Sequence, residues 1–147
     1  MKKYELTSNF KIDFFGRKLF QIRALISFGI VRAGDLGGWI QDEKNLDHNG
    51  NAWVSGDAWV SGNARVYGDA DYTTIKGFGS VFRTTTFFKC KDGLVRISCG
   101  CFYGTIEEFR LKVKETHGNT KLAVEYLKIA DLMEYHFSDE EVNNERI

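Results

Sequence analysis

Four consecutive hexapeptides between Gly50 and Thr73 constrain the fold more than any other part of this 147-residue chain. They read GNAWVS, GDAWVS, GNARVY and GDADYT, with no insertion or deletion between them. A period of six is too long for the pleat of a strand and too short for a helical hairpin. It is typical of a parallel β-helix, in which each hexapeptide supplies one short strand and one corner.

Two apolar columns run through the repeat and define its expected interior. Residues two apart on a strand point to the same side, so both columns are predicted to point inward. Glycine occupies the corners and is followed by Asn or Asp, which tolerate left-handed backbone angles. One column holds Ala52, Ala58, Ala64 and Ala70, and the other holds Val54, Val60, Val66 and Tyr72.

The larger column extends beyond the perfect repeat. Ile40 and Leu46 precede it with the same spacing, and the longer step that follows indicates a corner insertion at 47–49. Phe78 continues the ladder at the other end. Residues 36–79 are therefore predicted to form two to three coils.

The flanking segments predict two hairpins. Apolar residues alternate through residues 4–25 around a turn at 15–18, which indicates an antiparallel hairpin. The pair Asp92-Gly93 is a strong turn signal within 80–104, and alignment around it places Phe88 near Ile97.

The carboxyl-terminal part predicts two helices. Thr105 and Glu108 form a capping box that opens the first helix, and Gly118 ends it. Asn119 or Thr120 begins a second helix that runs to about residue 137. A short link between two helices predicts an αα-hairpin.

Three motifs carry a resemblance to known families. The tandem Gly-Asn-Ala-x-Val units resemble the left-handed hexapeptide-repeat β-helix family. The segment AGDLGGWI at 33–40, followed by Asn45-Leu46 and the repeat, is similar to small bacteriophage and prophage proteins built on a short left-handed β-helix. The segment SCGCFYGTIEEF at 98–109 resembles a module that follows such repeats in phage proteins.

The predicted fold is mainly β with a carboxyl-terminal α part. A short left-handed parallel β-helix is flanked by an amino-terminal β-hairpin, a second β-hairpin and the αα-hairpin. The expected segments are 1–35 for the first hairpin and cap, 36–79 for the β-helix, 80–104 for the second hairpin, 105–137 for the helices and 138–147 for a flexible acidic tail.

Composition excludes several classes of partner. The chain has 20 basic and 20 acidic side chains, so no net charge attracts a DNA or RNA polymer or an anionic membrane. No apolar stretch approaches the roughly 18 residues of a membrane span, and no signal peptide is apparent. The three cysteines are odd in number, which favours reduced thiols. We therefore expect a cytoplasmic protein, and the resemblance implies the cytoplasm of an infected bacterium.

The outward position of the four repeats holds Trp53, Trp59, Arg65 and Asp71. Exposed tryptophan is costly, so one interpretation is that both indoles pack against the amino-terminal hairpin, the helices or another subunit. The other interpretation is a stacking platform for a base, with arginine binding phosphate bidentately and asparagine reading base edges. The candidate ligand-binding residues are Trp53, Trp59 and Tyr67 for stacking, Arg65 and Arg83 for phosphate, and Asn51 and Asn63 for base edges.

Catalytic chemistry has weak support. Many hexapeptide-repeat proteins are acyltransferases with a histidine base, and only His48, on the corner insertion, lies where such a base would be. His117 and His136 are explained by helix dipoles. The spacing of Cys99 and Cys101 is too short for the usual metal chelate, so buried thiols are predicted. We expect no catalytic residue, no metal, no cofactor and no enzymatic activity.

Three functions compete. The resemblance implies a phage anti-defence protein that sequesters a cyclic di- or trinucleotide immune signal without hydrolysing it. The alternatives are a structural or protein-interaction module without a small ligand, and an acyl-CoA-dependent transferase. Short hexapeptide solenoids commonly form trimers, so a homotrimer that holds ligand between subunits is expected.

Overall fold

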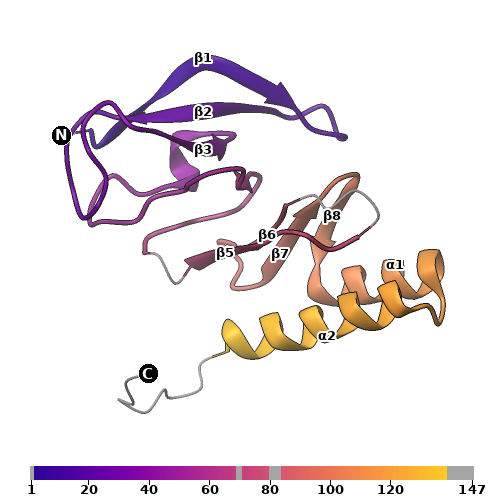
Figure 1. Cartoon of the computed structure of the whole chain (residues 1–147). Coiled ribbons are helices and arrows are strands. Elements are labelled where there is room, and N and C mark those ends of the chain that lie inside the picture. Colours follow the sequence, from indigo (N-terminus) through magenta and orange to yellow (C-terminus); the bar gives the residue numbers. More distant parts are fainter. Residues whose placement is uncertain (1, 69–70, 80–83, 139–147) are drawn as a thin grey trace.

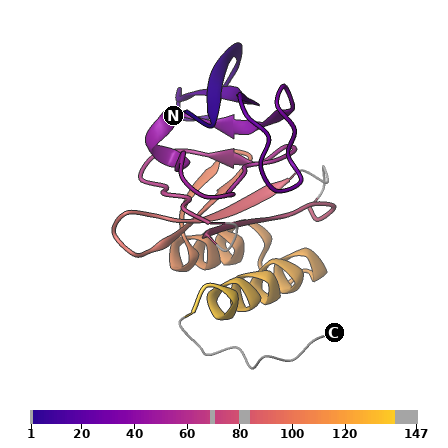
Figure 2. The ribbon, with the colours of Figure 1, turned by 90° about the vertical axis from the view of Figure 1, so that its left-hand side faces the viewer.

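The computed structural model of the chain describes residues 2–68, 71–79 and 84–138. Two four-stranded sheets lie one above the other, and two helices cover the outer side of the second sheet (Figures 1 and 2). The elements are β1 (Tyr4–Ile12), β2 (Lys18–Ala24), β3 (Leu36–Ile40), the 3-10 turn η1 (Glu43–Asn45), β4 (Trp59–Val60), β5 (Tyr72–Ile75), β6 (Thr85–Lys89), β7 (Val95–Cys99), β8 (Phe102–Thr105), α1 (Ile106–His117) and α2 (Lys121–His136).

The first sheet has the order β1-β2-β3-β4. Strands β1 and β2 form the predicted antiparallel hairpin, and Asp13 closes its turn by accepting backbone hydrogen bonds from Phe15 and Arg17. Strand β3 continues the antiparallel pairing on the other side of β2. Only the last pair, β3 with β4, is parallel, with Trp39 opposite Trp59.

The predicted left-handed parallel β-helix over residues 36–79 is wrong. Among the described residues of this segment, the β3–β4 pair is joined by one more parallel bridge, between Leu46 and Val66. Elsewhere its neighbours are antiparallel, because Ala64 bridges Cys90 and strand β5 pairs with β6. Strands from outside the repeat thus take the backbone hydrogen bonds that a further coil would have used, and the chain forms two mixed or antiparallel sheets instead.

The inward direction of the two columns is nevertheless confirmed. The described alanines of one column and the three valines of the other are all buried. Side-chain alternation fixes which residues face inward whichever strand supplies the partner. The ladder ends sooner than predicted, since Tyr72 is only half-buried and Phe78 packs in a different apolar cluster. Ala70 lies outside the described residues.

The second sheet has the order β5-β6-β7-β8 and is antiparallel throughout. Its strand β6 is buried on both faces. Phe88 joins the core under the first sheet, whereas Phe87 joins the core under the helices. The hairpin places Phe88 one position from Ile97 in the ladder, because Ile97 lies opposite Phe87 and Phe88 lies opposite Arg96.

The two carboxyl-terminal helices agree with the sequence prediction. Thr105 and Glu108 form the expected capping box at the start of α1, and Gly118 follows the last residue of that helix. Thr120 caps α2 by accepting a hydrogen bond from the Ala123 amide. The helices pack their apolar faces on β6, β7 and each other, which gives the second core its outer wall.

One tyrosine joins the two halves of the molecule. The Tyr103 hydroxyl on β8 donates to the Ser61 carbonyl at 3.3 Å. The Arg17 guanidinium lies 3.8 Å from the centroid of the Tyr103 ring. The Phe88 ring also packs on the Tyr103 ring, with the two centroids 6.0 Å apart. A side chain of the second sheet therefore contacts the first hairpin, the repeat and the central strand.

Replacing Gly62 by alanine should destabilise the protein more than the same change at Gly56. Both glycines have positive φ, 65° and 58°, so each substitution carries a backbone cost of about 1–2 kcal/mol. A Cβ at Gly62 would also overlap the Tyr103 hydroxyl, whereas one at Gly56 has nothing within 4 Å. We expect about 1 kcal/mol of additional loss for Gly62→Ala in the free energy of unfolding by urea.

The variant Tyr103→Phe provides the control, because it removes the hydroxyl that the new methyl group meets. In that background, Gly62→Ala and Gly56→Ala should cost nearly the same free energy. Equal losses in the wild-type background would contradict the contact between Gly62 and Tyr103.

Candidate functional site

Three of the seven predicted ligand-binding residues lie together on the surface. Asn63, Arg65 and Tyr67 alternate with the buried Ala64 and Val66, so their side chains point to the same outer side. Asn63 is exposed, Arg65 is half-buried and Tyr67 is 60% exposed. The outer side of this one repeat therefore presents an amide, a guanidinium and a phenol ring.

The turn between β6 and β7 lies beside this segment and adds two lysines. The Arg65 amide donates to the Lys89 carbonyl at 3.0 Å, and the Lys91 amide donates to the Asn63 carbonyl at 2.8 Å. These backbone bonds fix the spacing of the two segments. Between them lies a hollow of about 380 Å³, lined by Arg65, Tyr67, Asp71, Lys89, Cys90 and Lys91.

Two further hollows continue this one toward the first sheet. A hollow of about 80 Å³ shares Arg65 and Lys91 with the first, and it shares Lys44 and Asn63 with a third of about 410 Å³. The three hollows therefore adjoin one another along the surface through these shared lining residues. The basic groove, as we call it, is lined by Lys18, Phe20, Lys44, Asn63, Arg65, Tyr67, Lys89 and Lys91, together with Asp42 and Asp71.

The charge of the basic groove is mostly uncompensated. Asp71 accepts backbone hydrogen bonds from Tyr67 and Gly68 and lies 3.9 Å from the Lys89 ammonium. Asp42 caps η1 through the amide of Lys44. No described carboxylate lies within ion-pair distance of Lys44, Arg65 or Lys91. The groove can therefore offer several positive groups to one anion.

The other predicted residues lie elsewhere. Trp53 packs inside the fold, with its ring centroid 5.5 Å from that of Phe28 and 6.5 Å from that of Tyr4. The position of Trp53 therefore agrees with the interpretation that its indole packs against the amino-terminal segment, and not with a stacking surface for a base. Asn51 is exposed near Gly29 and lines none of the three hollows of the groove. Trp59 lines a separate cleft, and Arg83 lies outside the described residues.

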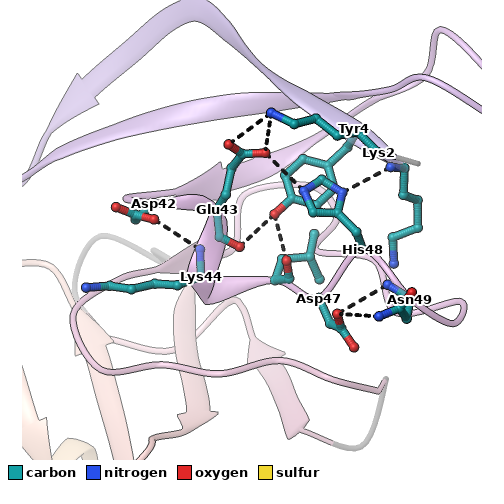
Figure 3. A network of polar contacts seen from close by, with 10 residues as sticks. Lys2, Tyr4, Asp42, Glu43, Lys44, Asp47, His48 and Asn49 are labelled. Atoms are coloured by element: carbon teal, nitrogen blue, oxygen red, sulfur yellow. Dashed lines mark hydrogen bonds and ion pairs between the residues drawn. The ribbon is translucent and has the colours of Figure 1, made fainter.

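His48 belongs to a polar network at the amino-terminal end of the molecule (Figure 3). Its Nδ1 accepts the Lys3 amide at 3.0 Å, and its Nε2 lies 3.0 Å from the Glu43 carboxylate. The Tyr4 ring stacks on the imidazole at 4.1 Å. Because Nδ1 is an acceptor, the ring proton is on Nε2 and is donated to Glu43.

This arrangement gives His48 a structural role rather than that of an acyltransferase base. Both ring nitrogens have partners, one face of the ring is covered, and the residue does not line the basic groove. Burial of Tyr4 raises the pKa of its phenol, which remains neutral and donates to the Leu46 carbonyl at 2.7 Å. The network therefore fixes η1 against β1.

The thiols differ from the prediction at one position. Cys90 is buried and Cys99 is half-buried, but Cys101 is exposed, because it lies in the turn between β7 and β8. Burial raises the pKa of the Cys90 thiol despite the nearby Arg96. Within the described ranges, no cluster of three His, Cys, Asp or Glu side chains could hold a metal ion.

Sequence reasoning missed Lys44, Lys89 and Lys91. Backbone hydrogen bonds between segments more than twenty residues apart bring them to the groove, and such long-range contacts cannot be predicted from local sequence periodicity. The strong Asp92-Gly93 turn was the one available signal, since it predicted that the residues before it lie at the end of a hairpin.

A scan of protein-family models and searches of curated proteins and of solved structures found no match to this chain. In the part of the chain that the structure describes, no helix has the length and apolar character needed to cross a bilayer.

The Glu43 carboxylate should make stability depend on pH. Partial burial opposes its ionisation, yet hydrogen bonds from His48 and Lys2 lower its pKa below the ordinary value. The ionised form therefore stabilises the fold above the unfolded pKa of about 4.3, and this contribution is lost as the pH falls through the folded pKa. Because the side chain is 38% exposed, we expect an effect below about 1 kcal/mol.

Urea unfolding of wild type and Glu43→Gln at several pH values measures this contribution. The stability advantage of wild type at pH 7 should shrink between about pH 5 and pH 3, where Glu43 becomes protonated. An advantage that stays constant over this range would contradict the assignment.

Proposed function

We propose that this protein binds and sequesters a cyclic di- or trinucleotide in the basic groove, without hydrolysing it. The observation that carries the proposal is the group of uncompensated cations, Lys44, Arg65 and Lys91, beside the exposed ring of Tyr67. If bacterial defence uses this nucleotide as a signal, binding alone would keep it from its receptor. The protein would then be a phage anti-defence factor that acts in the host cytoplasm.

Each part of a cyclic nucleotide finds a partner in the groove. Arg65 offers paired donors that match a phosphate, while Lys89 and Lys91 supply additional positive charge. A base can stack on Tyr67, with each such contact worth about 1–3 kcal/mol. The Asn63 amide carries both a donor and an acceptor for a base edge.

Binding without turnover fits the side chains that line the groove. Hydrolysis of a phosphodiester requires an activated nucleophile and a means of stabilising the leaving group. Among the described groove residues, Cys90 is the one thiol, and burial raises its pKa, which keeps it protonated. Asp71 is already engaged by two backbone amides and lies near Lys89.

We also propose that the binding form is a homotrimer with ligand held between subunits. The left-handed coil on which the expectation of a trimer depends is not formed. Support comes from the open groove of each copy, which its neighbour in a ring of three would close over a ligand. Light scattering at micromolar concentration tests this, and a monomer mass with ligand present would contradict it.

Calorimetric titration with cyclic mono-, di- and trinucleotides tests the proposed function. Arg65→Ala should weaken binding about tenfold or more, because it removes a charge-assisted contact. The affinity of Arg65→Lys should lie between those of wild type and Arg65→Ala, since lysine keeps the charge but lacks the paired donors. Heat denaturation of the complex should release intact ligand, as judged by chromatography.

Lys112→Ala is the matched control, because this exposed lysine lies on α1 and does not line the groove. It should leave the affinity unchanged. Absence of binding by wild type across the whole panel would overturn the proposal, and recovery of altered ligand would make the protein an enzyme.

The second candidate is a protein-interaction module, and one observation favours it. Large apolar side chains are exposed in two places near the first sheet: Phe14 in the turn of the hairpin is 73% exposed, and Ile30 is 100% exposed. Exposed apolar groups of this size often mark binding surfaces. The calorimetric panel separates the two candidates, because this module would bind no nucleotide.

A further inference from the structure

A second cleft lies between the two sheets, at the end of the molecule that carries the β1–β2 turn. It has a volume of about 640 Å³, larger than any of the hollows in the basic groove. The end of β1 and its turn form one side, and the starts of β6 and of the β7–β8 turn form another. No residue lines both this cleft and the basic groove, so the two are separate sites.

The charges in this cleft leave one cation without a carboxylate partner. Asp13 pairs with Arg17 at 2.8 Å, and Asp57 pairs with Lys76 at 3.2 Å. Lys11 has no carboxylate within ion-pair distance among the described residues. Among its described lining residues, the cleft therefore presents a single uncompensated positive charge, in contrast with the several in the basic groove.

Two indole rings hold this ammonium in place. The Lys11 Nζ lies 4.4 Å from the ring centroid of Trp39 and 5.7 Å from that of Trp59. Trp39 and Trp59 are neighbours because β3 and β4 pair in parallel at this position. Cation–π attraction orients an ammonium but does not neutralise it. An anion entering the cleft thus meets a charge whose position is already restricted.

The rest of the lining is amphipathic. Ile12 and Phe14 are 62% and 73% exposed and form an apolar rim. The Thr86 hydroxyl accepts the Trp59 backbone amide at 3.1 Å, which ties the backbone of β4 to β6. Ser98 adds a hydroxyl, and the exposed Cys101 adds a thiol. The cleft thus places a few large apolar side chains beside several polar groups that can orient a small molecule.

From these features we infer that the cleft is a second ligand site that binds a small organic monoanion with a flat apolar body. The carboxylate or sulfonate group of the ligand lies beside Lys11, and its body lies against Ile12, Phe14 and Trp59. One unpaired ammonium complements one negative charge, whereas a ligand with several phosphates is better matched by the basic groove. The inference does not depend on what the basic groove binds.

Fluorescence titration with two probes of similar ring structure tests the inference. The anionic probe is 8-anilinonaphthalene-1-sulfonate, and the neutral one is N-phenyl-1-naphthylamine. We expect the sulfonate to bind wild type with one-to-one stoichiometry and about tenfold more tightly than the neutral probe, because of its contact with Lys11. Lys11→Met should abolish this preference and leave the neutral probe unaffected. The control Lys91→Met, in the basic groove, should change neither affinity.

Alkylation of Cys101 locates the probe independently of affinity. Cys101 is the exposed thiol among the three and lines this cleft, whereas Cys90 is buried and lines the basic groove. Bound sulfonate should slow modification of Cys101 by iodoacetamide in wild type, as measured by peptide mass spectrometry, but not in Lys11→Met at the same probe concentration. Equal affinity for the two probes, retention of the sulfonate preference in Lys11→Met, or no protection of Cys101 would each overturn the inference.

Discussion

The burial of strand β6 on both faces is the constraint on which the rest of the structure depends. Phe88 and Phe87 are consecutive residues, so they point to opposite sides and enter two different cores. Each core covers one face of β6. Loss of the core under the first sheet would expose Phe88 to water, and loss of the core under the helices would expose Phe87. The two sheets and the helices therefore form one cooperative unit, although sequence divides them into distinct segments.

The basic groove follows from the same alternation of side chains. Burying Ala64 and Val66 turns Asn63, Arg65 and Tyr67 outward, and the backbone bonds to Lys89 and Lys91 bring the two lysines beside them. The cations are thus held by main-chain geometry rather than by pairing with carboxylates. The backbone of such a groove is in place before an anion arrives, so ordering on binding is confined to the side chains.

Sequence predicted which residues are buried better than it predicted which strands pair. The six-residue period placed Val54 and Val60 inside, and the capping box placed the start of α1 at Thr105, since both signals are local. Strand pairing depends on segments that are distant in the sequence. The pairing of β2 with β3 and of β6 with β5 is not indicated by any local pattern in the repeat. For the same reason sequence placed Asn63, Arg65 and Tyr67 in one repeat and offered packing as one interpretation of Trp53, but it did not supply the lysines of the groove.

The double burial of β6 also has a consequence for synthesis of the chain. The segment TTTFFKC at 84–90 contains one charge, no proline and several β-forming side chains, which is the composition of an aggregation-prone stretch. It leaves the ribosome before β7, β8 and both helices exist, so one of its faces stays uncovered until about fifty more residues have followed. Lys89 is then the gatekeeper that opposes edge-to-edge pairing of nascent chains, and a chaperone that recognises extended aromatic segments would find its binding site here.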